Sequence, residues 1–284
     1  MPVRQILALT ALLYSCSAQP STPSVELYPK PALSSQASPS VRFFQADIKT
    51  TIRSSLSGLP SSTLVKSGVK MALMLDGTQF KLRMDCSGDC FADKKTHTIV
   101  YDKKLKKLSM FTDGVLDTVN NTPDLQGFVT AMVNTSIPFV STDDPFVKES
   151  VSAFSSRVSL SGGTVSSSSG TGSGSVYQSS TTSTPTPGTS LTSSLSFDAG
   201  LGMVTQTKTR RVGSSSEENW TSDISYTSAI TPRSGVTVPA NMHVPYKISS
   251  SGTLKQGTQT INIDQTIEYA NIKLNAIDET YFTP

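Results

Sequence analysis

The pattern of apolar and polar positions indicates β-structure most clearly in one hairpin. An apolar stretch, Val69–Leu75, is followed by Asp76-Gly77 and then by Gln79–Met84, in which apolar and polar residues alternate. Successive side chains of a strand point to opposite faces, so the second stretch has one buried and one solvated face. Asp-Gly supplies the positive φ angles that a two-residue hairpin turn requires. The apolar residues that share a phase are Met71, Leu73 and Leu75 in the first stretch and Phe80, Leu82 and Met84 in the second, whereas Met74 is out of phase.

Other segments are also predicted to form β-strands. Thr98–Tyr101 and Leu108–Phe111, joined by a basic turn, predict a second hairpin that continues the sheet. Further strands are predicted at Leu195–Phe197, Met203–Thr209, Trp220–Tyr226 and Thr258–Leu274.

Few helices are expected. Asp143-Asp144-Pro145 offers acidic capping and a proline in a first turn, which predicts a helix through the segment that follows. Its apolar stripe consists of Phe146, Val147, Val151 and Phe154. A second helix is predicted within Asp124–Val133, and both would cover one face of a curved sheet.

The N-terminus has the pattern of an export signal. Arg4 precedes an apolar run, Ile6–Leu13, that is too short to cross a bilayer of about 30 Å as a helix. The run ends in Leu13-Tyr14-Ser15-Cys16, which resembles the bacterial lipobox and implies diacylation of the Cys16 thiol and cleavage before it. Acyl chains contribute about 0.8 kcal/mol per buried methylene, so two or three of them hold a protein on a membrane. The alternative is an ordinary cleaved signal in which Cys16 is incidental.

Composition divides the chain into three parts. Residues 1–15 are the predicted signal peptide, and 16–41, rich in Ser and Pro, is the predicted lipidated, flexible tether. Residues 42–284 are long enough for one large domain. Ser161–Ser190 is nearly all Ser, Thr, Gly and Pro, which predicts a flexible loop that interrupts this domain or, alternatively, a linker between two domains.

The net charge of the chain does not favour any class of partner. The formal net charge is +3, and 16% of the residues are charged. Lys94-Lys95 and Lys103–Lys107 would form one positive edge if the strands between them pair, either as solvated turns or as a contact with anionic lipid head groups. No aromatic residues interleave with these lysines, so no nucleic-acid partner is predicted.

Two cysteines remain besides Cys16. Cys86 and Cys90 enclose Ser-Gly-Asp, and in an exported protein such a pair is expected to form a disulfide that closes a turn, worth about 2 kcal/mol. The alternative is a copper or redox site, which would need His97 or His243 as a further ligand.

Catalytic patterns are missing from the sequence. It has two histidines and no G-x-S-x-G, H-E-x-x-H, P-loop or strand-associated G-x-G-x-x-G motif. A non-enzymatic binding role without cofactor or metal is therefore predicted.

The C-terminal stretch carries a family resemblance. Its strand ends in Lys273-Leu274-Asn275, before an acidic turn and the aromatic and proline residues of Tyr281–Pro284, and it resembles the closing strand of the LolA/LolB-like lipoprotein carriers. Phe197–Val204 resembles the mid-chain hairpin of that family. The Ser-rich segment and the cysteine pair depart from the family pattern. The resemblance implies a mainly β (α+β) fold, with a single strongly curved antiparallel sheet, an open half-barrel, and a few covering helices.

The same resemblance implies a carrier that holds acyl chains against an apolar concave face, with no catalytic residue. Methionine side chains adapt to irregular ligands, although at strand spacing they also serve as ordinary core. The candidate ligand-lining residues are Met71, Leu73, Phe80, Leu82, Met84, Met110 and Trp220.

The predicted function is thus an exported lipoprotein, anchored to a membrane of the cell envelope through Cys16, that binds a lipid or a lipoprotein acyl chain. Ser17 resembles the outer-membrane sorting preference of bacteria with two membranes. The alternative is a structural or adhesion protein of the envelope without a ligand cavity.

Overall fold

The computed structural model describes residues 23–28, 41–56, 60–76, 79–87, 95–105, 107–120, 146, 148–160, 162–168, 175–186, 188–233, 235–239 and 241–283. The strands are β1 Val25–Leu27, β2 Phe43–Leu56, β3 Ser62–Asp76, β4 Gln79–Cys86, β5 His97–Asp102, β6 Lys107–Thr112, β7 Val115–Asn120, β8 Thr164–Ser168, β9 Val176–Thr186, β10 Thr189–Asp198, β11 Met203–Val212, β12 Ser216–Thr227, β13 Thr231–Pro232, β14 Val244–Gln256 and β15 Gln259–Leu274. The helices are α3 Val151–Leu160 and the 3-10 helix η2 Glu279–Phe282.

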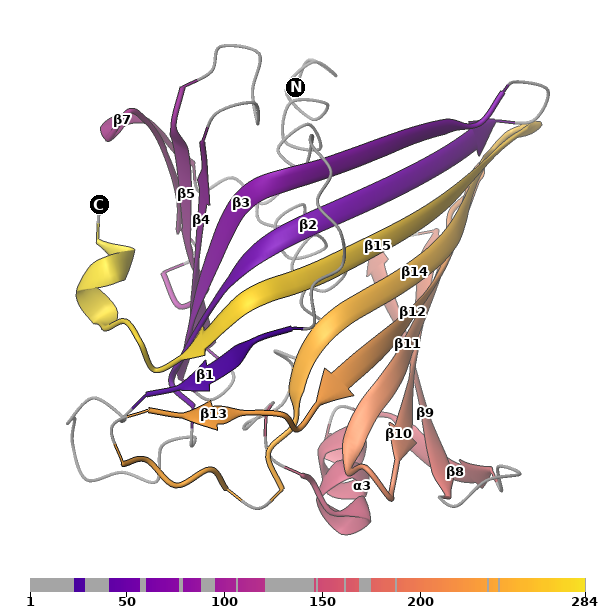
Figure 1. Cartoon of the computed structure of the whole chain (residues 1–284). Coiled ribbons are helices and arrows are strands. Elements are labelled where there is room, and N and C mark those ends of the chain that lie inside the picture. Colours follow the sequence, from indigo (N-terminus) through magenta and orange to yellow (C-terminus); the bar gives the residue numbers. More distant parts are fainter. Residues whose placement is uncertain are drawn as a thin grey trace.

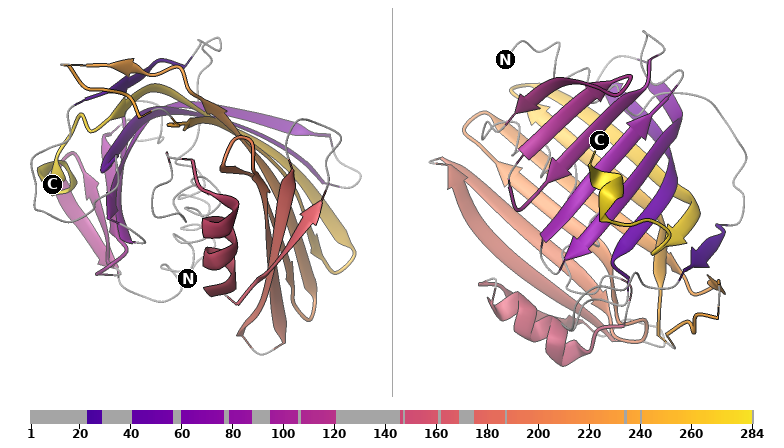
Figure 2. Two further views of the ribbon diagram at one scale, coloured as in Figure 1. Left: turned by 90° about the horizontal axis from the view of Figure 1, so that it is seen from below. Right: turned by 90° about the vertical axis from the view of Figure 1, so that its left-hand side faces the viewer.

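In the described part of the chain, the strands form one 15-stranded sheet that is strongly bent and not closed. Its main path runs β7-β6-β5-β4-β3-β2-β15-β14-β12-β11-β10-β9-β8, so each half of the chain is a meander and β15 joins the two halves through β2. Neighbours along this path are antiparallel. Figure 2 shows α3 on the inner side of the bend and the C-terminal η2 on the outer side. The predicted open, curved antiparallel sheet is confirmed.

Strand β1 corrects the prediction that all of residues 16–41 is a tether. Val25 and Leu27 are each 2% exposed, and β1 pairs in parallel with the end of β15. It finds a free edge there because β14 pairs with β15 only as far as Glu268, which leaves the last residues of β15 open on that side (Figure 1). Alternation over three residues was too short to stand out in a Ser- and Pro-rich segment.

The prediction of a flexible loop at Ser161–Ser190 is wrong, because this segment contains β8, β9 and the start of β10. β9 pairs with β8 on one side and with β10 on the other. Val165 and Tyr177 pack against a cluster that contains Phe154 and Val158 of α3. The few apolar residues of the segment thus pack against α3, which directly precedes it in sequence, and composition alone does not reveal this.

Helix α3 begins later than predicted. The Ser150 side chain accepts a hydrogen bond from the backbone N–H of Ala153, which caps the helix at Val151. The residues before it bond elsewhere: the N–H of Lys148 donates to the carbonyl of Asn241, and the N–H of Glu149 donates to that of Gly202. These tertiary bonds hold the preceding chain out of the helix, and Asp143-Asp144-Pro145 and the second predicted helix, Asp124–Val133, lie outside the described residues.

Both predicted N-terminal hairpins are present. Leu75 pairs with Phe80 and Asp76 with Gln79, as a two-residue turn requires. The single positive edge is not formed, however, because Lys95 and Lys103 lie at opposite ends of β5, a separation of roughly 20 Å for a strand of that length.

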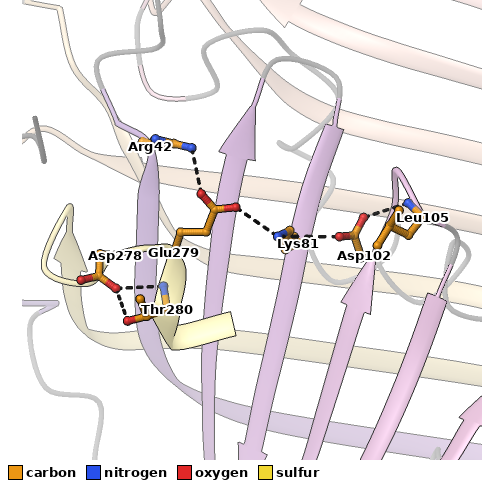
Figure 3. A network of polar contacts seen from close by, with 7 residues as sticks. All are labelled: Arg42, Lys81, Asp102, Leu105, Asp278, Glu279 and Thr280. Carbon is orange, nitrogen blue, oxygen red and sulfur yellow. Dashed lines mark hydrogen bonds and ion pairs between the residues drawn. The ribbon is translucent and has the colours of Figure 1, made fainter. Parts of the chain in front are cut away.

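The out-of-phase Met74 has a partner on the outer face. Met74 packs with Phe43, Ala72 and Phe282 in a small cluster beneath η2. Figure 3 shows polar contacts that fix η2 in place: Glu279 lies 3.2 Å from Lys81 Nζ and 3.6 Å from an Arg42 guanidinium nitrogen.

The N-terminal cap of η2 is Asp278. The hydroxyl and the backbone N–H of Thr280 both donate to its carboxylate, and these bonds lower the pKa of Asp278 (Figure 3). The C-terminal segment therefore serves as an outer cover for part of the sheet.

Candidate ligand-binding face

The concave face of the sheet collects the sequence-predicted lining residues. Their exposed fractions are small: Met71 1%, Leu73 0%, Leu82 0% and Met84 6%, all in one large apolar cluster, with Met110 packed partly buried against it. Trp220 is on the same face of the sheet, in phase with Ile224 of that cluster. The side chain of Phe80 lies outside the described residues.

We call the fully buried end of this face the base. Aromatic rings hold it together: the ring of Phe44 stacks on Phe146 with centroids 5.7 Å apart and meets Tyr269 edge-on at 5.9 Å. Burial raises the pKa values of both Tyr269 and Tyr226, and the Tyr226 hydroxyl donates to the carbonyl of Val204 at 2.8 Å. The base is packed core, with both phenols neutral.

Toward the far ends of the long hairpins the same face changes character. We call this part the tip, and its apolar side chains are only partly buried. They are Ile52, Leu56, Leu64, Trp220, Leu254, Ile261 and Ile263. Strand register brings several of them together, because Leu254 pairs with Ile261 and Leu56 pairs with Ile261 from the other side.

Trp220 lies over a glycine in the tip. Gly252 of β14 is its direct cross-strand partner, and a Cβ at this position would lie 2.5 Å from two ring carbons of the tryptophan. The missing side chain thus makes room for the indole against the sheet, and the remainder of the ring faces the concave side.

A row of polar residues crosses the concave face between base and tip. Ser222 pairs with Ser250, and Ser250 pairs with Gln265. The two serine hydroxyls are buried and hydrogen-bonded to each other at 2.8 Å. Thr50 lies diagonal to Gln265, because it pairs with Ile267 one step closer to the base. We refer to Thr50, Ser222, Ser250 and Gln265 as the polar row.

Thr50 is unusual within the polar row. It is 1% exposed, and its Oγ1 has no hydrogen-bond partner among the described residues. A buried hydroxyl without a partner costs about 1 to 3 kcal/mol, so such groups call for a physical explanation.

The opposite, outer face is polar. Charged and amide side chains pair across the strands, as in Lys49 with Glu268 at 3.7 Å and Arg210 with Glu217 at 3.0 Å. A hollow of about 250 Å³ opens on this side, with the bulged end of β15 in its wall. Asn271, at φ 49° in that bulge, donates from its side-chain amide to Asp47 at 2.8 Å. The two faces of the sheet therefore differ in chemistry.

Of the predicted cysteine pair and the two histidines, the structure describes Cys86, His97 and His243. Cys86 is fully buried at the end of β4, opposite His97 on β5, while Cys90 lies outside the described residues, so the disulfide stays a prediction. His243 belongs to another region, where its backbone N–H donates to the backbone carbonyl of Phe146. Desolvation, together with the charge of Lys148, lowers the pKa of the His243 imidazole. Within the described ranges no three His, Cys, Asp or Glu residues are grouped so that they would hold a metal.

The lipidation site Cys16 also lies outside the described residues. None of the helices in the described part of the chain has the length and apolar content that crossing a membrane requires.

Sequence reasoning missed the polar row and most of the tip. Thr50 lies on β2, and Ser250 and Leu254 lie on β14. In both strands polar residues occur at inward-facing as well as outward-facing positions, so apolar and polar residues alternate only weakly. One usable signal was the recurrence of Ile at alternate positions in Thr258–Leu274. It indicates that these isoleucines share one face and need apolar partners on both neighbouring strands.

Two solved structures are similar to this chain over most of its length. One, from Vibrio parahaemolyticus, is described as an outer membrane lipoprotein-sorting protein domain; it is 10% identical, with a TM-score of 0.40, and the match covers 85% of this chain and 89% of that one. The other is a DUF1329 family protein from Desulfovibrio piger, 7% identical, with a TM-score of 0.41 and coverage of 86% and 90%. A likeness of this size says nothing about what the chain binds. No protein-family model and no curated protein match the sequence.

Proposed function

We propose that this chain is a non-enzymatic protein of the cell envelope that binds the acyl chain of a lipid or lipoprotein on the concave face of its sheet. One observation carries the proposal: the concave face is apolar at its buried base and at its partly exposed tip, on either side of the polar row, while the other face carries ion pairs. Partly exposed apolar side chains gathered on a concave surface favour an apolar ligand.

The tip is the part of the face where a ligand would bind. Leu73 and Leu82 of the base are completely buried, so they contribute stability, whereas Trp220 and Leu254 of the tip keep part of their surface accessible. An acyl chain that covers the tip would remove this apolar surface from water, at about 25 cal/mol per Å².

Native mass spectrometry of detergent-free protein tests the proposal. We expect lipid to co-purify with the wild type and to be lost in Leu254→Asn, which should stay folded because water still reaches the position. The matched control is Thr253→Asn, since Thr253 is partly buried on the outer face of the same strand. Absence of lipid from the wild type, or equal lipid in both variants, would favour a structural or adhesion protein without a ligand.

We further propose that Cys16 carries the acyl chains that anchor the protein to its membrane. The support is the position of Cys16, directly after the apolar run of the signal and at the end of Leu13-Tyr14-Ser15. An anchor of this kind would hold the protein at a membrane that supplies its ligand.

A further inference from the structure

We propose that the turn between β5 and β6 binds anionic lipid head groups, so that the rim of the sheet at its base end faces the membrane. We call this rim the basic rim, and the exposed lysines that the turn contributes to it are Lys103, Lys104 and Lys107. The inference rests on the proposed acylation of Cys16, because that anchor brings the rim within reach of a bilayer. It adds the orientation of the protein, in which the tip faces away from the bilayer and binds a lipid that has left it.

The proposed anchor has a limited reach. From Cys16 to Val25 the backbone spans at most about 30 Å when it is fully extended. Val25 pairs with Ile272 near the end of β15, and from there this strand extends for about 45 Å to Gln259. A bilayer that touched the far ends of the strands would therefore lie beyond the reach of the anchor, whereas the β1 end of the sheet lies within it.

The basic turn lies on the same rim as β1. Leu27 of β1 pairs with Leu274, and successive partners across β2, β3, β4 and β5 lead to Leu108 on β6. These residues form one row across the sheet, which is about 30 Å long at the usual spacing of neighbouring strands. The turn projects beyond this row at the end where β15 also finishes, so a bilayer near β1 meets the lysines of the turn.

The carboxylates beside the turn are compensated by other cations. Asp102 lies 3.8 Å from Lys81, and Glu279 lies between Lys81 and Arg42. These four residues form a neutral chain of ion pairs that leads up to the turn, and Asp278 lies at the end of this chain away from the turn (Figure 3). The two carboxylates of the chain therefore do not offset the positive charge of the turn.

The turn itself is held in shape. The Asp102 carboxylate accepts a hydrogen bond from the backbone N–H of Leu105 at 2.9 Å, which fixes the reversal of the chain. Lys104 and Lys107 are exposed, and neither forms an ion pair within the described ranges. Lysines at an anionic surface each raise the affinity about fivefold. A few of them orient an anchored protein without holding it on the membrane by themselves.

Vesicle co-sedimentation tests the inference. The protein is the mature chain from residue 16 with Cys16→Ala, which carries no acyl anchor. The probes are vesicles that contain phosphatidylglycerol and vesicles of phosphatidylcholine alone. At low ionic strength we expect binding to the phosphatidylglycerol vesicles only. This binding should be lost at about 1 M salt, where the screening length falls to about 3 Å.

Two double variants of this protein locate the contact. Lys104→Gln with Lys107→Gln should lower the affinity for phosphatidylglycerol vesicles about 20- to 30-fold, at about fivefold for each lysine. The matched control is Lys95→Gln with Lys208→Gln, which removes the same charge at exposed positions away from the basic rim. The control should bind nearly as tightly as its parent, and both variants should keep the melting temperature of the parent because all four side chains are exposed.

The outcomes keep this inference apart from the proposed function. No binding to phosphatidylglycerol vesicles, equal binding to both kinds of vesicle, or an equal loss of affinity in the two double variants would each overturn the membrane contact of the basic rim. None of these results would touch the acyl-binding face or the anchor, because co-purified lipid and fractionation of the acylated wild type measure those separately.

Discussion

At the scale of single residues, the concave face depends on close contacts between side chains of neighbouring strands, and the strand register determines which side chains meet. The indole of Trp220 occupies the space above Gly252, and the hydroxyls of Ser222 and Ser250 satisfy each other in the neighbouring row. Each pair joins β12 to β14, which are neighbours in the sheet but not consecutive strands of a hairpin. A single substitution at these positions therefore disturbs a cross-strand contact as well as the local chain.

Gly252→Ala should destabilise the protein by about 1 to 3 kcal/mol, the usual cost of overpacking. The added Cβ would lie 2.5 Å from ring carbons of Trp220 and 2.8 Å from the carbonyl oxygen of Asn219, so the indole must move. Urea unfolding measures the loss, and a shifted Trp220 emission maximum reports the displaced ring. Ser251→Ala, an exposed position on the outer face, serves as control and should change neither quantity. A Gly252→Ala protein with wild-type stability and emission would contradict this fit.

Cys86 and Cys90 are expected to be disulfide-bonded in protein taken from the envelope. Cys86 is 0% exposed in the folded protein, so labelling must be done after unfolding. Without reductant, a maleimide reagent should then modify neither thiol, and with reductant it should modify both. Modification of both without reductant would contradict the prediction.

At the scale of elements, two covers lie on opposite sides of the sheet. On the inner side α3 packs on β8 to β11 through Phe154, whose ring stacks on Phe197 at 4.5 Å. On the outer side η2 packs on β2 and β3 through Phe282. Each cover buries a small apolar cluster separate from the base, so each should affect local stability more than ligand binding.

Phe282→Ala should lower the free energy of unfolding by about 3 kcal/mol, at the lower end for a buried phenylalanine because its cluster is small. Phe282 is 5% exposed and stacks on Phe43 with centroids 6.3 Å apart. Chemical denaturation measures the change, and the exposed Thr283→Ala is the control. A loss below about 1 kcal/mol would mean that η2 covers little of the sheet.

Replacing residues 161–188 by a short Gly-Ser link should destabilise the fold. The deletion removes β8 and β9, exposes the edge of β10 and strips Val165 and Tyr177 from the cluster under α3. We expect a lower melting temperature and increased binding of a hydrophobic dye. An unchanged melting temperature would instead support the flexible loop that composition alone predicts.

At the scale of the whole molecule, the bend of the sheet gives its two faces different roles. The outer face carries pairs such as Lys49 with Glu268, which contribute little stability where they are exposed. The inner face carries nearly all the large apolar side chains, and its tip is the part that stays accessible.

Cys16→Ala should release the protein from membranes, because the acyl chains are the only strong membrane contact that the sequence predicts. Fractionation of cells that express wild type and variant measures the change, with Ser17→Ala as a control that leaves the thiol intact. A Cys16→Ala protein that still pellets with membranes would mean that another part of the chain or a partner holds it there.

Local pattern determined much of this fold. The Asp76-Gly77 signal and the alternation after it specified the hairpin of β3 and β4, because both depend on neighbours in sequence. The register differs from that of an Asp76-Gly77 turn, because Asp76 itself pairs with Gln79. The strands at Trp220–Tyr226 and Thr258–Leu274 were predicted for the same reason. The placement of Met71, Leu73, Leu82 and Met84 on one buried face follows from the period of two.

Tertiary structure decided what depends on distant partners. Val25–Leu27 became a strand because β14 leaves the edge of β15 open, and the Ser-rich segment became strands because α3 covers its few apolar residues. The polar row required the pairing of β12, β14, β15 and β2, which joins residues about 200 positions apart and therefore leaves no local signal. The amino-acid sequence by itself thus determined the inward-facing residues of the strands that alternate clearly, and the assembled sheet decided the rest and which of them meet.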